Sequence, residues 1–206
     1  MKILFVEDRP SRQLLFLPNK EKDVEHIRSL KSVYMPESNE CKEIIAQINQ
    51  NNYNFENSLK LIIVHKSALE TRGLEYINNF CKNEKVKLVC FSGGISQLTY
   101  NNEDYEFLNI NSSDFYTERL VPFLNGFIAE KSETLLELAN KEWKLSYMLL
   151  ARQIIGSIAL ENDEDVKFNL EDKLDKINNI LSFDFTINSE NTEKLNTEIK
   201  RIILSL

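Results

Sequence analysis

Several residue patterns that define common enzyme and disulfide-rich folds are missing from this sequence. Its five glycines form neither a GxGxxG nucleotide-binding pattern nor a P-loop of the form GxxxxGK[ST]. The three cysteines, Cys41, Cys81 and Cys90, are odd in number, widely spaced and set among apolar residues. This arrangement excludes a disulfide framework and predicts reduced, buried thiols in a cytoplasmic protein.

Long hydrophobic runs and an excess of positive charge are also absent. The longest apolar window, residues 148–160, is interrupted by Arg152 and Gln153 and is too short to span a bilayer. The N-terminus reaches Glu7 after a few apolar residues, which predicts no secretory signal. The formal net charge is −7, and this acidic balance opposes non-specific binding to nucleic acid. We therefore expect neither a membrane nor a nucleic-acid partner.

What the sequence does contain is typical of a globular α/β protein. A chain of 206 residues, with 42% hydrophobic and 28% charged residues, can bury one sizeable core or one core and a smaller second unit. Four short apolar runs lack polar alternation, which favours strands that are covered on both faces of a parallel sheet. The runs are residues 3–6, 61–64, 87–91 and 107–110. Residues 32–35, which precede a proline, suit an edge strand.

Helical patterns separate these runs. We expect an interrupted first helix around Pro18, a second helix after Asn39 and a third over residues 71–82. Strands and helices that alternate in this way predict a doubly wound, five-stranded parallel sheet of the α/β class. Residues 93–104 are poor helix material, so that crossover is expected to be short or irregular. A closing helix follows residue 116. We therefore place an α/β domain at residues 1–130 and an all-helical extension at residues 131–206.

One segment and the order of the later strands resemble a known family. The segment KILFVEDRPSRQLL is similar to the opening of a response-regulator receiver domain, in which an acidic pair ends the first strand. In the matching order follow LKLIIVHKS, KLVCFSGG and FLNINSSDF, which resemble the third, fourth and fifth strands. The resemblance spans about residues 2–128, and only the first motif in it is distinctive. It implies a receiver-like fold of the flavodoxin type.

The resemblance implies a phosphoryl-transfer site with two of its four roles unfilled. Glu7 and Asp8 match the acids that hold Mg²⁺ in receivers, and Ser92 matches the hydroxyl residue. The phospho-accepting aspartate is missing, because His65 and Lys66 stand at the end of the third run. The lysine expected after the fifth run is missing as well. The resemblance therefore implies a pseudo-receiver without the aspartyl-phosphate switch. In this pseudo-receiver, Glu7 and Asp8 are what remains of the Mg²⁺ site.

Other chemistry at these residues stays open from the sequence. His65 can be phosphorylated, ligate a transition metal beside Glu7 and Asp8, or be only structural. Lys66 can fold back and neutralise the acidic pair. A triad of Ser92, His65 and an aspartate lacks a nucleophile-elbow motif. Residues 161–172 contain acidic residues at alternating positions, as a calcium-binding loop does, but they depart from the EF-hand pattern. We therefore expect this segment to be a solvated acidic linker.

The extension offers a candidate interface. A three-and-four spacing of aromatic and aliphatic residues runs along one long helix after residue 130, and it predicts either core packing or contact with a second copy of the chain. The candidate interface residues are Trp143, Tyr147, Leu150, Ile154 and Ile158. A faint strand pattern, FDFTI at residues 183–187, is the one strand signal in this part of the sequence.

These observations favour a non-enzymatic signalling or adaptor protein, without a cofactor, that binds a protein partner and forms a homo-oligomer through its C-terminal helices. One alternative is a ligand- or metal-binding domain with hydrolytic or phosphotransfer activity in a cleft of Glu7, Asp8, His65 and Ser92. A second alternative is a transcription regulator. The extension has more acids than bases, which argues against DNA binding.

Overall fold

The computed structural model describes residues 2–132, 134–140, 142–181 and 189–204. The chain forms two compact units, residues 1–141 and residues 142–206, which are called the α/β unit and the helical unit below. In the described part of the chain, no helix is both long enough and apolar enough to cross a bilayer.

A six-stranded sheet organises the α/β unit, with the strand order β2-β1-β3-β4-β6-β5. The strands are β1 (Ile3–Val6), β2 (Val33–Tyr34), β3 (Leu61–His65), β4 (Lys87–Ser92), β5 (Thr99–Asn101) and β6 (Phe107–Asn111). All neighbouring pairs are parallel except β5 and β6, which are antiparallel. The α/β class is confirmed, and the five expected strands form at or close to their expected positions.

The expectation of five parallel strands is wrong at the segment before β6. Residues 99–101, placed in an irregular crossover from the sequence, form an edge strand in which Tyr100 pairs with Leu108. Thr99 and Tyr100 are residue types that favour strands, and the Tyr100 hydroxyl donates a hydrogen bond of 3.0 Å to Glu106. A short hairpin therefore replaces the crossover helix that a doubly wound fold would have here.

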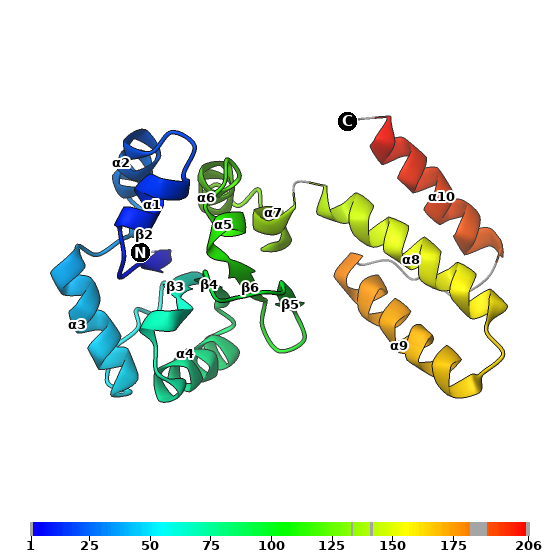
Figure 1. Ribbon diagram of the computed structural model, residues 1–206, viewed down its shortest axis with the longest axis horizontal. Helices are drawn as coiled ribbons and strands as arrows, with labels where there is room; N and C mark the ends of the chain where they lie inside the picture. Colours follow the sequence, from blue (N-terminus) through cyan, green and yellow to red (C-terminus); the bar gives the residue numbers. More distant parts are fainter. Residues whose placement is uncertain (1, 133, 141, 182–188, 205–206) are drawn as a thin grey trace. The chain divides into compact units, whose positions relative to one another are not determined.

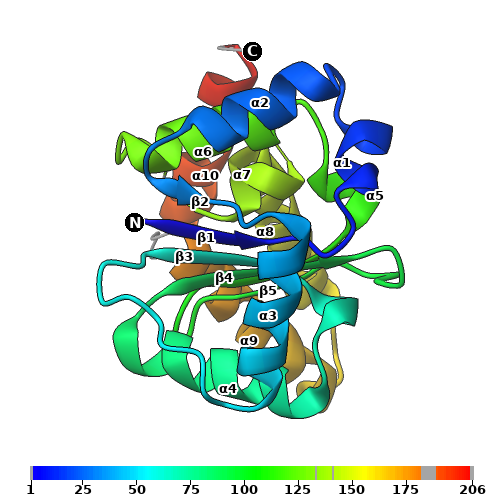
Figure 2. The same cartoon turned by 90° about the vertical axis from the view of Figure 1, so that its left-hand side faces the viewer.

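Helices cover both faces of the sheet, as Figure 2 shows. One face carries α2 (Glu21–Ser29) and α6 (Leu120–Ile128), and the other carries α3 (Ser38–Asn49) and α4 (Thr71–Glu84). Shorter helices lie at the ends of strands or between these elements: α1 (Ser11–Phe16), η1 (Lys66–Ala68), α5 (Ser112–Phe115) and α7 (Leu136–Ala139). The sequence around Pro18 forms two helices, α1 and α2, because the proline falls in the turn between them.

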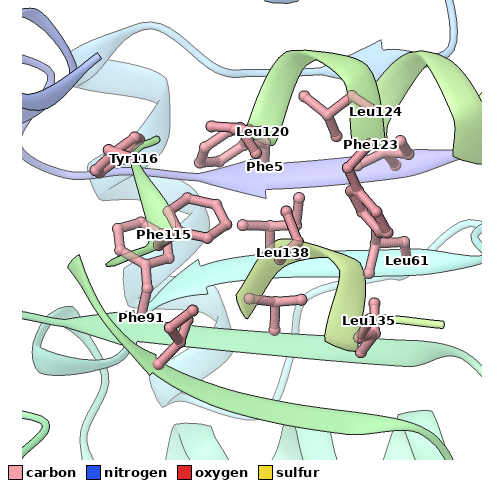
Figure 3. Packing of buried hydrophobic residues seen from close by; sticks show 14 of the residues in the cluster. Phe5, Leu61, Phe91, Phe115, Tyr116, Leu120, Phe123, Leu124, Leu135 and Leu138 are labelled. Atoms are coloured by element: carbon pink, nitrogen blue, oxygen red, sulfur yellow. The ribbon is translucent and has the colours of Figure 1, made fainter. Parts of the chain in front are cut away.

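Alternation along each strand divides the core into two layers. On β1, Ile3 and Phe5 face one layer, and Leu4 and Val6 face the other. The first layer is rich in aromatic rings, with Phe91 and Phe115 stacked at a centroid distance of 4.6 Å (Figure 3). All of these strand residues are buried, which explains why the runs read as continuously apolar in the sequence.

The α/β unit extends beyond the boundary expected at residue 130. Leu135 and Leu138, at and within α7, are fully buried in the first core layer beside Leu61 and Phe123 (Figure 3). The sequence assigned both leucines to the helical extension because their spacing continues into the next helix. Asn140 has an extended backbone, with φ −152° and ψ 123°, and it ends α7 before α8 begins. The long helix expected after residue 130 is therefore two helices.

The helical unit contains α8 (Trp143–Leu160), α9 (Glu164–Leu181) and α10 (Ser189–Ile203), and α8 packs against both of the others (Figure 1). The segment expected to be a solvated acidic linker is largely the start of α9. Its first turn is capped by Asp163, whose carboxylate accepts hydrogen bonds from the backbone N–H groups of Asp165 and Val166. The faint strand pattern at residues 183–187 lies outside the described residues.

Candidate functional site at the carboxyl edge of the sheet

Parallel pairing brings the sequence-predicted residues to one edge of the sheet. Val6, the last residue of β1, pairs with Val64 of β3, so Glu7 and Asp8 emerge beside His65. Donor atoms of Glu7, Asp8 and His65 all lie within 4.8 Å of one another. Ser92 ends β4, the next strand in the sheet. The edge between β1 and β3 is where the strand order reverses, and open α/β sheets bind ligands at such a place.

His65 is the centre of the site and is fully buried. Its Nδ1 forms a short hydrogen bond with a carboxylate oxygen of Asp8, and its Nε2 contacts the guanidinium of Arg12. The Ser67 hydroxyl also reaches Nε2, at 2.7 Å. Because a guanidinium can only donate, Nε2 is the acceptor and the ring proton is on Nδ1, pointing at Asp8. Burial lowers the pKa of His65 although its hydrogen bond with Asp8 opposes this, so the ring is neutral near pH 7.

Glu7 is held by a separate set of partners on the first core layer. Its exposed fraction is 4%, and its carboxylate accepts a hydrogen bond of 2.5 Å from the Tyr116 hydroxyl and one of 2.8 Å from the Arg9 backbone N–H. Burial raises the pKa of Glu7 to about 7, against the opposing effect of these two hydrogen bonds. This carboxyl group therefore keeps its proton to a higher pH than an ordinary glutamate does.

The positive charge at this site comes from α1 and the residues before it. Arg12 contacts His65, and the Arg9 guanidinium lies 3.6 Å from the Asp8 carboxylate. The hypothesis that Lys66 neutralises the acidic pair finds no support, since the ion pairs recorded among the described residues include none between Lys66 and Glu7 or Asp8. Lys66 instead begins the 3-10 helix η1.

Ser92 and Asn111, at the ends of β4 and β6, form hydrogen bonds with nearby backbone groups. The Ser92 hydroxyl accepts a hydrogen bond of 3.3 Å from the backbone N–H of Gly94 and lies 3.3 Å from the Ser67 hydroxyl. At the end of β6, where the resemblance calls for a lysine, the Asn111 side chain accepts from the backbone N–H of Ser113 and caps α5. The serine that contacts His65 is therefore Ser67, and Ser92 is one step further away.

The possible metal ligands Glu7, Asp8 and His65 do not fit Mg²⁺ in this arrangement. Mg²⁺ prefers an octahedron of oxygen ligands with several waters, whereas an imidazole with two carboxylates suits zinc, manganese or iron. Asp8 and the Nδ1 atom of His65 already bind each other, and the guanidinium of Arg12 adds a positive charge beside them. A divalent ion would have to open the Asp8–His65 hydrogen bond to enter.

A cavity of 410 Å³ with a mixed polar and apolar lining adjoins this edge on the α3 side. It is lined by Asp8, Lys42, Ile45, Ala46, Asn49, Gln50, Ala68 and Glu70. Asp8 belongs to both the cavity and the histidine site, and Ala68 follows Ser67 in η1. The cavity therefore adjoins the histidine site through Asp8 and Ala68, while His65 and Ser67 themselves are not among its lining residues.

The sequence did not identify Arg12, Ser67 and Tyr116 as members of the site. Arg12 follows Asp8 by four residues and Ser67 follows His65 by two, so both were close to recognised positions. Tyr116 lies 109 residues from Glu7 in the chain, and no local pattern connects the two. Only the arrangement of α5 beyond β6 brings that hydroxyl to the Glu7 carboxylate.

The candidate interface of the helical unit is mostly its own core. Trp143, Ile154 and Ile158 are buried, because α8 packs against α9 and α10 of the same chain. Tyr147 is half-buried, and Leu150 is 43% exposed. The apolar stripe therefore has a partner within the unit, and Leu150 is the residue of this set that is open to another molecule.

No protein-family model, no curated protein and no solved structure shows significant similarity to this chain. The resemblance to receiver domains thus depends on the residues and the strand order described above. Function has to be argued from the geometry of the site, because a fold alone does not define it.

Proposed function

We propose that the chain is a signalling or adaptor protein whose α/β unit is a pseudo-receiver that binds a protein partner without being phosphorylated. The strand order supports this proposal. Without β5, the parallel strands taken in chain order follow 2-1-3-4-5, the order of flavodoxin-like folds such as receivers. The added antiparallel strand β5 changes the edge of the sheet next to β6, so a partner would meet a different surface there.

The bonding of His65 is the observation that carries the proposal. His65 stands at the position of the phospho-accepting carboxylate, and Asp8 and Arg12 occupy its two ring nitrogens. The remaining acid, Glu7, is bound by Tyr116 and by the backbone of Arg9. Since the chain itself satisfies the groups that would hold a metal and a phosphoryl group, this edge resembles a fixed scaffold more than a switch.

Exposed apolar side chains provide the surface for a partner. Leu14, Leu15 and Phe16 of α1 are consecutive and are 40%, 72% and 39% exposed. They follow Arg12 on the same helix, so any partner bound there would lie close to the histidine site. In the helical unit, Leu149 and Leu150 are 44% and 43% exposed and offer a smaller surface for self-association.

The proposal is tested by affinity isolation of the tagged chain from its native cells, with a chelator and a phosphatase present. We expect a stoichiometric protein partner to be recovered under these conditions, since binding needs neither Mg²⁺ nor phosphate. Leu15→Glu should abolish recovery of that partner, whereas Gln47→Glu, which adds the same charge on exposed α3, should retain it. Recovery of no stoichiometric partner, or loss of the partner with phosphatase, would contradict the proposal.

A further inference from the structure

Three side chains at the carboxyl edge form a continuous hydrogen-bonded series from Asp8 through His65 to Ser67. Asp8 binds Nδ1 of His65, and the Ser67 hydroxyl lies 2.7 Å from Nε2. We propose that Ser67 is an acylatable nucleophile, that His65 is its general base, and that this edge hydrolyses esters of small polar acids. The activity goes beyond the proposed function, which requires no chemistry at Ser67.

The assignment of roles follows from the contacts of each side chain. His65 accepts at Nε2 and donates at Nδ1, which is the tautomer that a serine nucleophile needs. Asp8 is a positioning residue, because its contact is with the far side of the imidazole. Ser67 is exposed in η1 and can meet a substrate, whereas the ring that activates it is buried.

Arg12 shares Nε2 with Ser67 and completes the site. A guanidinium carries five N–H donors and a permanent positive charge. When the Ser67 proton moves to Nε2, the Arg12 N–H group loses its acceptor and turns to the negative oxygen that forms on the substrate. Arg12 thereby supplies the electrostatic stabilisation that an oxyanion requires.

The reaction requires only these residues, the ester and water. Ser67 Oγ transfers its proton to Nε2 of His65 and bonds to the carbonyl carbon, and the C=O electron pair moves to oxygen. When that pair returns, the C–O bond to the alcohol breaks, and the alcohol leaves with the proton from Nε2. Water then attacks the acyl group in the same way, which releases the acid and restores the Ser67 hydroxyl.

The adjoining cavity defines the class of substrate. Its volume of 410 Å³ is in the range of small-molecule sites, and Ala68 places the cavity next to Ser67. Lys42, Asn49 and Gln50 line it together with the acids Asp8 and Glu70, so its walls suit hydroxyl or amide groups. Esters of short polar acids fit this lining better than lipid esters, whose long apolar chains would meet charged walls.

The experiment treats the full chain with a rhodamine-linked fluorophosphonate, a probe that bonds irreversibly to activated serines, and locates the adduct by peptide mass spectrometry. We expect labelling at Ser67, its complete loss in Ser67→Ala, and a loss of roughly a hundredfold or more in labelling rate for His65→Gln. Ser113→Ala, which alters an exposed serine at the same end of the sheet, should be labelled like the wild type. An unlabelled wild type, or labelling unchanged in His65→Gln, would overturn the proposal.

Two further variants separate chemistry from folding. Asp8→Ala should lower the labelling rate, and Asp8→Glu should restore part of it because a carboxylate can again orient His65. A folded Asp8→Ala protein, judged by circular dichroism, that labels like the wild type would refute the role of Asp8. Ser67→Ala should still recover the protein partner, so that failure of the acylation proposal and failure of the adaptor proposal give different results.

Discussion

The two units bury different kinds of side chain. In the α/β unit, Glu7, Gln13 and His65 are buried at or beside one edge of the sheet, and most of their polar atoms have partners. In the described part of the helical unit, the buried residues are apolar apart from Asn178, and the charged residues are at the surface. Burying ionisable groups costs stability unless they are paired, and functional sites are places where such groups cluster. This contrast is why we place the proposed function in the α/β unit and expect packing and self-association from the helical unit.

The largest expected effect comes from removing the imidazole at the centre of the buried network. His65→Ala leaves Asp8 and Arg12 without their partner, and we expect a loss on the order of 3 kcal/mol in the free energy of unfolding. Urea denaturation followed by circular dichroism measures it. His26→Ala is the matched control, because His26 is exposed, and it should change stability by about 0.5 kcal/mol or less. Equal effects of the two variants would show that the buried network adds nothing to the stability that His65 contributes.

In the helical unit, the same kind of test separates core from interface. Ile154→Ala should cost about 2–4 kcal/mol because Ile154 is buried within the unit, whereas Leu150→Ala should cost less than about 1 kcal/mol. The fluorescence of Trp143, the single tryptophan, reports unfolding of this unit directly. A concentration-dependent loss of stability in Ile154→Ala would instead place this residue in a contact between copies.

Self-association through the helical unit is a separate prediction. Leu150→Glu puts a charge on the exposed apolar surface of α8, and it should shift any dimer of the chain to monomer. Light scattering after size-exclusion chromatography measures the change in mass. If Leu150→Glu leaves a dimer intact, the contact between copies lies elsewhere.

The smallest expected effect is on the pH dependence of stability. The pKa of Glu7 is about 7 in the folded chain, above its ordinary value of 4.5, so the folded state binds more protons between these values and its stability falls as the pH rises. Glu7→Gln removes this contribution and should stabilise the protein at pH 8, relative to the wild type, by on the order of 1 kcal/mol. The lowered pKa of His65 acts in the opposite direction, since its contribution is lost as the pH falls through the ordinary histidine value.

Urea unfolding of Glu7→Gln and the wild type at pH 5 and pH 8 measures this difference, because His65 is present in both proteins. A stability difference between the two proteins that is the same at both pH values would show that the Glu7 carboxyl group titrates normally.

Strands were easier to predict from the sequence than the site was. The buried runs of β1, β3, β4 and β6 are continuously apolar, and a run of that kind has few other ways to fold. Strand β5 was not predicted because it is an exposed edge strand of three residues. The end of α7 was not predicted because the apolar spacing continues past Asn140, although the backbone of Asn140 is extended and ends the helix. In the site, Glu7, Asp8 and His65 could be predicted to meet, because they end neighbouring strands.

The contacts within the site could not be predicted from the same information. The sequence does not show whether Ser67 or Ser92 contacts His65. The turn of η1 brings the Ser67 hydroxyl to the imidazole ring, and Ser92 contacts Ser67 instead. The approach of Tyr116 to Glu7 depends on the packing of Phe91 and Phe115 beneath it, which no local pattern encodes. Burial and hydrogen-bond partners of this kind are set by tertiary structure.

The central claim is that the carboxyl edge of the sheet is not a phosphorylation switch. The most direct test is to incubate the purified full chain with phosphoramidate and Mg²⁺ and to measure its intact mass. We predict no phosphoryl adduct, because the acceptor carboxylate is missing and Asp8 holds the Nδ1 atom of His65. A stable adduct on His65, or on either of the acids beside it, would contradict the account and restore a phosphoryl-transfer role for this edge.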